Sequence, residues 1–331
     1  MPIAPEDIKY YRSATVSDTS SNGGRMSASE IISGAAKNVF PAIGESERTA
    51  GSLKYRKVFC KNANADGLTL QESKVYLDQY TLGDDIVTFF AASQIDTQAD
   101  ITGTEKKYGC GKLDANASAS DTVIDVLVED GASNPFEDGD EFRITNMANV
   151  EAAGQEEICT IVGAPVVVGD VVTITFTPAL VNSYSASASR VMMIFRPTPA
   201  DTVAIAGDLV VTSAAGTFDA DNLLADNEGT IEQDWTLTFT SGTTFNIVGD
   251  TVGAQGSGSI GAGAAPDNGG APYFPLPAAG FGGTYLAGDT IEFTTHPSAV
   301  PVWIRREVPP AAAASSTNKF VIVLDGETSD A

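Results

Sequence analysis

Residues 256–261 read Gly-Ser-Gly-Ser-Ile-Gly, which matches the Gly-x-Gly-x-x-Gly pattern that binds the pyrophosphate of dinucleotides. That chemistry requires a helix directly after the glycines and an acidic residue about 20 positions further on. Here Ala-Pro-Asp-Asn-Gly-Gly soon follows, which cannot begin a helix, and position 281 is Phe. We therefore interpret the segment as a flexible loop and expect no nucleotide cofactor.

The sequence contains one histidine, His296, which directly precedes Pro297 in a predicted turn. A hydrolase triad places a histidine beside a nucleophile and an acid. The sequence has no Gly-x-Ser-x-Gly elbow, no P-loop and no His-Glu-x-x-His motif. We interpret His296 as a structural turn residue, assign no catalytic or cofactor-binding residue, and predict that the protein is not an enzyme.

Two acidic runs are candidates for cation binding, because carboxylates are ligands that Ca²⁺ prefers. They are residues 137–141, Glu-Asp-Gly-Asp-Glu, and residues 219–222, Asp-Ala-Asp-Asn. Neither follows the twelve-residue spacing of an EF-hand loop, so we interpret both as solvated turns and assign no metal ligand. The sequence alone leaves Ca²⁺ binding at these turns open.

Cys60, Cys110 and Cys159 are odd in number and widely spaced, so we predict three buried thiols and no zinc ribbon. Reduced thiols are typical of a protein made in a reducing compartment. The first residues lack the basic and apolar regions of a secretory signal, and no apolar run reaches the ~20 residues that cross a bilayer. We therefore expect a soluble protein that is made in the cytoplasm.

Charge is distributed unevenly along the 331 residues, whose formal net charge is −24. Residues 1–112 hold 13 Lys and Arg against 14 Asp and Glu, whereas residues 113–331 hold 6 against 29. Such an acidic surface repels nucleic acid and anionic membrane, and a DNA reader would need a basic stripe. The acidity suits a conduit through which DNA slides without sticking; solubility alone is the other explanation.

The elements that would position any site are mainly strands, because β-branched and aromatic residues recur between turns rich in the 32 Gly and 16 Pro. Residues 122–129 alternate, with Ile124, Val126 and Val128 on an apolar face that should meet a core. Residues 235–240 and 243–248, joined by Ser-Gly, predict a β-hairpin. Gly-Asp precedes a β-prone run at residues 139, 169, 207 and 288, which predicts repeated turns into strands.

Residues 1–52 differ from the rest of the chain and predict a polar N-terminal arm with one short helix. Ser27 and Glu30 form a capping box for a helix that Pro41 ends. Residues 253–283 contain 10 Gly and predict a long loop with aromatic residues near its end. Because neither segment is well placed to form a core of its own, we predict assembly contacts in both, at Arg25, Phe40, Tyr273, Phe274 and Phe281.

The predicted fold class is mainly β, with tandem β-sandwich or barrel-like domains, the extended arm and the one short helix. The predicted domains are the arm at 1–52, a first β domain at 53–196 and a second at 197–331 that carries the Gly-rich loop 253–283.

Four short segments between residues 22 and 110 resemble a family of structural proteins in the virions of tailed bacteriophages: Asn22-Gly-Gly-Arg25, Asn38-Val-Phe-Pro41, Arg48-Thr-Ala-Gly51 and Tyr55-Arg-Lys-Val-Phe59. The segment Val302-Trp-Ile-Arg-Arg-Glu-Val-Pro309 is similar to a closing segment of such proteins. Some long-tailed phages build the tail tube from subunits with two tandem β domains, and this sequence looks like that arrangement.

The resemblance implies a virion subunit that assembles in the host cytoplasm, with itself into stacked trimeric or pseudo-hexameric rings and with other virion proteins. Acidic residues facing the channel would let DNA pass without specific binding, and no membrane partner is expected. A head-decoration or baseplate protein is the alternative within the virion. Outside virions the alternative is a β-rich adhesin or carbohydrate-binding module.

Overall fold

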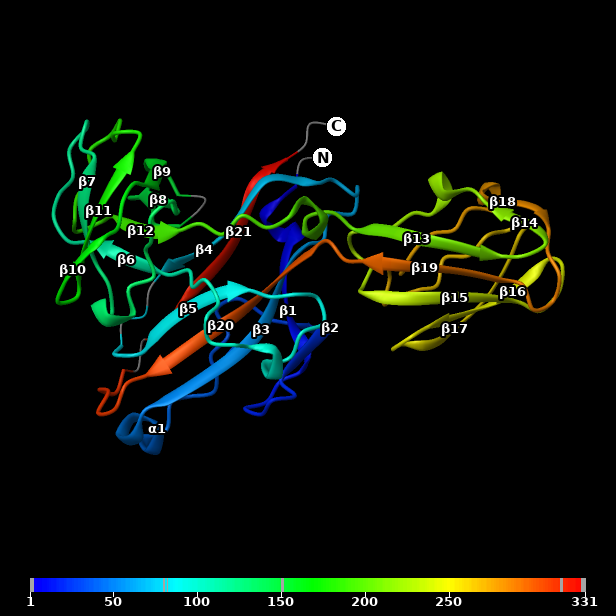
Figure 1. The fold of residues 1–331 in the computed structure, drawn as a ribbon, viewed down its shortest axis with the longest axis horizontal. Helices are drawn as coiled ribbons and strands as arrows, with labels where there is room; N and C mark the ends of the chain where they lie inside the picture. Colours follow the sequence, from blue (N-terminus) through cyan, green and yellow to red (C-terminus); the bar gives the residue numbers. More distant parts are fainter. Residues whose placement is uncertain (1–2, 80, 82, 150–151, 316–317, 329–331) are drawn as a thin grey trace.

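The computed structural model describes residues 3–79, 81, 83–149, 152–315 and 318–328. The chain forms three β-rich units that lie side by side, with a central unit between a barrel unit and a distal unit (Figure 1). The mainly-β class is confirmed, and α1 (Glu45–Ala50) is the one α-helix of the described chain. Single turns of 3₁₀ helix join the strands: η1 Pro5–Asp7, η2 Gln98–Asp100, η3 Gly131–Ser133, η4 Pro199–Asp201, η5 Ala220–Asn222 and η6 Ala278–Gly280.

The central unit combines both ends of the chain. Its five-stranded sheet has the order β2-β1-β3-β20-β5, and a two-stranded sheet pairs β21 with β4. Strands β3 and β20 pair antiparallel from Lys61↔Ala299 to Ser52↔Val308, and their buried side chains pack with those of the smaller sheet. The strands are β1 Ile8–Thr15, β2 Gly23–Glu30, β3 Ser52–Asn62, β4 Leu70–Gln79, β5 Ile86–Ala91, β20 Ala299–Val308 and β21 Val321–Thr328.

The barrel unit is one sheet in the order β10-β11-β7-β6-β12-β8-β9, which the pairing of β11 with β9 closes. The predicted alternation of residues 122–129 is confirmed, because Ile124, Val126 and Val128 are buried in the barrel core. The strands are β6 Cys110–Leu113, β7 Val123–Leu127, β8 Glu141–Thr145, β9 Glu156–Ile161, β10 Val166–Val168, β11 Val171–Thr177 and β12 Arg190–Met193.

The distal unit has a five-stranded sheet in the order β13-β19-β15-β16-β17 and a smaller sheet that pairs β14 with β18. The predicted hairpin is confirmed, since Thr236 pairs with Val248 and Phe239 with Phe245. Its core is rich in aromatic rings, among them Trp235. The strands are β13 Ile205–Thr212, β14 Ala215–Phe218, β15 Gln233–Phe239, β16 Thr244–Gly249, β17 Gly253–Ser259, β18 Phe281–Thr284 and β19 Thr290–His296.

The helix predicted to start at Ser27 is wrong. Residues 23–30 form β2, which pairs with β1 through Ser13↔Met26 and Tyr11↔Glu30. The Ser27 hydroxyl donates to the carbonyl of Arg12 instead of capping a helix. Pairing with a neighbouring strand therefore overrides the local capping signal, and the one helix forms at α1 instead.

The predicted division at residues 52 and 196 does not coincide with these units. Strands β1 and β2 belong to the central sheet and not to a separate arm, and β20 and β21 return the last part of the chain to the same unit. The barrel and distal units are therefore both inserted between strands of the central unit.

The Gly-Asp turns behave as predicted at three places, directly before β8, β11 and β19. The fourth, Gly207-Asp208, lies inside β13, where Asp208 has φ +52° and the pairing register shifts. This is a β-bulge, in which the positive φ suits Gly or Asp. Residues 253–283, predicted as a loop, contain β17, η6 and β18.

Candidate functional site

The junction between the central and distal units is polar. The hydrophobic cores of the two units share no residue, and the chain crosses between them around residues 197–204 and 297–298. Lys61 Nζ donates to the carbonyl of Glu228 at 2.6 Å, and Asn62 Nδ2 donates to that of Thr202 at 3.1 Å. Hydrogen bonds and ion pairs, more than apolar packing, hold the distal unit in place.

His296 lies at this junction as the last residue of β19, held between two carboxylates. Its Nδ1 is 2.9 Å from Glu232 Oε2 and its Nε2 is 3.2 Å from Asp201 Oδ1. Burial alone would lower the pKa of His296, but the bonds to Asp201 and Glu232 raise it to about 9. Burial alone would raise the pKa of the Asp201 carboxyl, but the contact with His296 and the hydrogen bonds from Thr198 and Gln94 together hold it below its usual range. The cluster is therefore an imidazolium between carboxylates at neutral pH.

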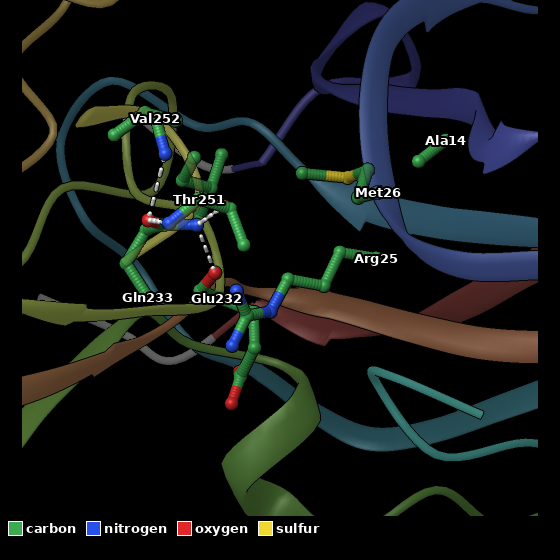
Figure 2. A pocket seen from close by; sticks show the side chains of 8 residues that line it. Ala14, Arg25, Met26, Glu232, Gln233, Thr251 and Val252 are labelled. Carbon is green, nitrogen blue, oxygen red and sulfur yellow. Dashed lines mark hydrogen bonds between the residues drawn. The ribbon is translucent and has the colours of Figure 1, made fainter. Parts of the chain in front are cut away.

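A cleft of about 260 Å³ lies beside this cluster, between strands β1 and β2 and the distal unit. Figure 2 shows Arg25 and Met26 on one wall and residues 232–233 and 251–252 on the other. Arg25 Nη1 crosses to Asp250 Oδ2 at 2.6 Å. The Gln233 amide oxygen accepts from the backbone N–H groups of Thr251 and Val252, so this polar group has its partners within the wall.

The junction is poorly equipped for acid–base or nucleophilic catalysis. Both ring nitrogens of His296 are engaged by carboxylates, so neither is free to activate a hydroxyl or thiol. In the part of the chain that the structure describes, no group of three or more His, Cys, Asp or Glu side chains is arranged so that it could hold a metal ion, and at the junction the two carboxylates bind the histidine itself. Of the acidic turns, Glu137 and Asp140 share Lys106 as a counter-ion at 2.8 Å each.

The five predicted assembly residues all have partners within the chain. Phe40 is buried against the guanidinium groups of Arg56 and Arg306, whose central carbons lie 5.5 and 4.4 Å from the centroid of its ring. Phe274 is fully buried against Trp235, with ring centroids 4.7 Å apart. Tyr273 and Phe281 pack against the same distal core, and Arg25 pairs with Asp250. The premise that these residues lack a core is wrong for Phe40, Tyr273, Phe274 and Phe281.

Sequence reasoning missed Asp201 and Glu232. They lie 95 and 64 residues from His296, in segments that carry no motif, so only the fold brings them to the histidine. His296 is predicted in a turn directly before Pro297 and is observed as the last residue of β19. Residues 256–261 fall on β17 and the turn after it and not on a strand-to-helix loop, so the geometry of a dinucleotide site is not present there.

A second surface feature is the valine ridge, Val166–Val168, which forms β10. This strand lies at the edge of its sheet and pairs with β11. The exposed fractions of Val166, Val167 and Val168 are 59%, 41% and 73%. Because Val166 stands opposite Thr173 and Val168 opposite Val171, the ridge continues as a β-branched outer face over β11.

All three cysteines are free and buried, as predicted. None of the helices in the described ranges has the length and apolarity needed to cross a bilayer. Comparison of the chain with protein-family models, curated proteins and solved structures gives no match. The fold and the junction define a three-unit β protein whose central and distal units meet through polar contacts.

Proposed function

We propose that this chain is a structural virion subunit that assembles with copies of itself, as in the stacked rings of a phage tail tube. The observation that carries the proposal is the valine ridge. Three consecutive exposed valines on an edge strand with no charged side chain form a surface that a solitary soluble protein avoids, because it invites pairing with another chain.

The partner that fits the ridge best is the central unit of a second copy. Residues 110–196, which hold the barrel, contain 13 acidic against 4 basic residues, whereas residues 1–109 and 299–331, which hold the central unit, contain 18 against 15. Contact between the barrel of one copy and the central unit of the next avoids bringing two acidic surfaces together. A contact between different surfaces is heterologous and generates rings or filaments.

The acidity also supports the role as a DNA conduit. Acidic side chains that line a channel would repel DNA along its length and leave it free to slide. The resemblance of the segments around Arg25, Phe40, Tyr55 and Trp303 to phage virion proteins supports the same class. Head decoration and baseplate roles would use the same self-association without a continuous channel.

A carbohydrate-binding module is the less favoured function. Sugar-binding surfaces usually present exposed aromatic platforms, and both tryptophans, Trp235 and Trp303, are buried in cores. Trp303 Nε1 further donates to Asp96 Oδ2 at 2.8 Å, which fixes the ring inside the central unit.

Negative-stain electron microscopy of the purified protein at increasing concentration tests the proposal. We expect hollow tubes or stacked rings for the unaltered chain and loss of both in the double variant Val166→Lys, Val168→Lys. Val248→Lys, at a valine of the distal unit with 43% exposure, is the matched control and should assemble normally. A chain that stays monomeric at every concentration would refute self-assembly. Normal assembly of the double variant would show that the valine ridge is not the surface through which the copies assemble.

A further inference from the structure

We infer that the distal unit, residues 205–296, is a hinged arm, and that His296, held between Asp201 and Glu232, latches it to the central unit. This inference goes beyond self-assembly and does not depend on it. It rests on how few apolar contacts join the two units and on how the latch spans three separate segments of chain.

The attachment of the arm is narrow. Two connectors lead into and out of it, and its aromatic core is separate from the core of the central unit. The other printed links are polar. Arg25 pairs with Asp250, and Lys61 donates to the carbonyl of Glu228. The side-chain amide of Asn62 donates to the carbonyl of Thr202, and that of Asn227 donates to the carbonyl of Leu68. Polar interfaces of this kind between domains permit relative motion, and the cleft of about 260 Å³ leaves room for it.

The latch is a continuous chain of contacts from the arm to the central unit. His296 and Glu232 belong to the arm, and Asp201 belongs to η4 on the incoming connector. The Asp201 carboxylate also accepts from Gln94 Nε2 at 3.3 Å, and the same amide donates to the carbonyl of Ala299 at 2.7 Å. Gln94 follows β5 and Ala299 begins β20, so the chain of contacts ends in the central sheet.

The positive charge of the His296 imidazolium stabilises its contacts with the carboxylates of Asp201 and Glu232. The charged groups facing His296 are Asp201 from η4 and Glu232 from the segment before β15, and a neutral ring would leave these carboxylates without a shared counter-ion. Further charges at the junction are Lys61 with Asp226, Glu228 and Lys9 around it, and the ion pair of Arg25 with Asp250. Because the pKa of His296 is raised to about 9, the latch is charged at neutral pH and loses its charge in mildly alkaline solution.

Double electron–electron resonance spectroscopy measures the distance between a spin label on the arm and one on the central unit. Spin labels at Ser46→Cys on α1 and Ser257→Cys on β17 report the distance between the two units, since both positions are exposed and all three native thiols are buried. We expect a narrow distance distribution at pH 7 that broadens with a midpoint near pH 9. His296→Gln should give the broad distribution already at pH 7.

Two controls separate the latch from other causes. A label pair within the arm, Ala220→Cys with Ser257→Cys, should keep one distance throughout, which excludes unfolding. Arg25→Gln breaks a different link and should keep the broadening near pH 9, because His296 is intact. The inference is overturned if His296→Gln matches the unaltered chain at pH 7. It is equally overturned if the broadening near pH 9 persists in His296→Gln, since Lys61, whose pKa burial lowers to about 8, would then be responsible.

Discussion

Asp78 on β4 and Arg190 on β12 form an ion pair of 3.1 Å that joins the central unit to the barrel unit. The same carboxylate oxygen lies 3.5 Å from Arg143 Nη1, and Arg143 is almost completely buried over the ring of Tyr76. Glu156 of β9 pairs with the other side of the Arg143 guanidinium. The barrel is thus anchored by a buried charge network, whereas the distal unit is attached by a more exposed latch.

Asp78→Asn should destabilise the protein strongly. Removing the carboxylate leaves two guanidinium groups near each other in a buried site, and breaking a buried pair typically costs about 3–5 kcal/mol. Chemical denaturation followed by circular dichroism measures the loss. Glu72→Gln is the control, because Glu72 pairs with Arg196 at 3.6 Å on the surface, where such pairs contribute less than about 1 kcal/mol. Equal effects of the two substitutions would contradict the network.

His296 should make the stability of the chain depend on alkaline pH. Its pKa is about 9 in the folded protein against 6.5 for the free side chain, so the folded state binds the proton more tightly. The stabilisation is complete below about pH 6.5 and is lost as the pH rises to 9 and above, by up to about 3 kcal/mol. The measurement is the difference in unfolding free energy between the unaltered chain and His296→Gln from pH 6 to 10. A difference that does not shrink with rising pH contradicts this assignment.

Glu129 should also make the stability of the chain fall as the pH rises, but in a lower pH range. Here the protonated form that the folded state favours is the neutral one, whereas at His296 it is the charged one. Burial raises the pKa of this carboxyl to about 7, although backbone hydrogen bonds, including one from Thr81, lower it in part. The folded state therefore binds a proton more tightly than the unfolded chain between about pH 4.5 and 7, and stability falls as the pH rises through that window. Glu129→Gln should gain about 1–2 kcal/mol at pH 8 and little at pH 4.5. Thermal unfolding at the two pH values decides between this result and an unchanged stability at pH 8.

The sequence predicts local features of this fold well. The alternation of Ile124, Val126 and Val128, the hairpin after Trp235 and the Gly-Asp turns are all encoded within a few residues, and all but one of these turns form as predicted. The exception at Gly207 and the misplaced helix at Ser27 share a cause, because in both places pairing with another strand decides the backbone.

The assembly of the three units could not be predicted in the same way. Strands β3 and β20 pair residues as distant as Ser52 and Val308, and no local pattern marks such a partner. The same holds for the latch, since His296, Asp201 and Glu232 become neighbours only after β19 and β15 pair and η4 packs beside them. Residues such as Phe274 looked available for a neighbour because the core that buries them lies in other segments.

The cysteines offer a direct test of how tightly the central and barrel cores are packed. Burial raises the pKa of Cys60 and Cys110 well above the usual range and that of Cys159 to about 11, so none is a thiolate at pH 8. Because the thiolate is the reactive species, an aromatic disulfide reagent should find no reactive thiol in the native protein and three in denaturant. At intermediate denaturant concentrations, the rate at which the thiols react should follow the global unfolding of the protein. Prompt reaction of one thiol in the native state would instead show that its unit opens locally, and Cys60, fully buried near the end of β3, would be the most informative of the three.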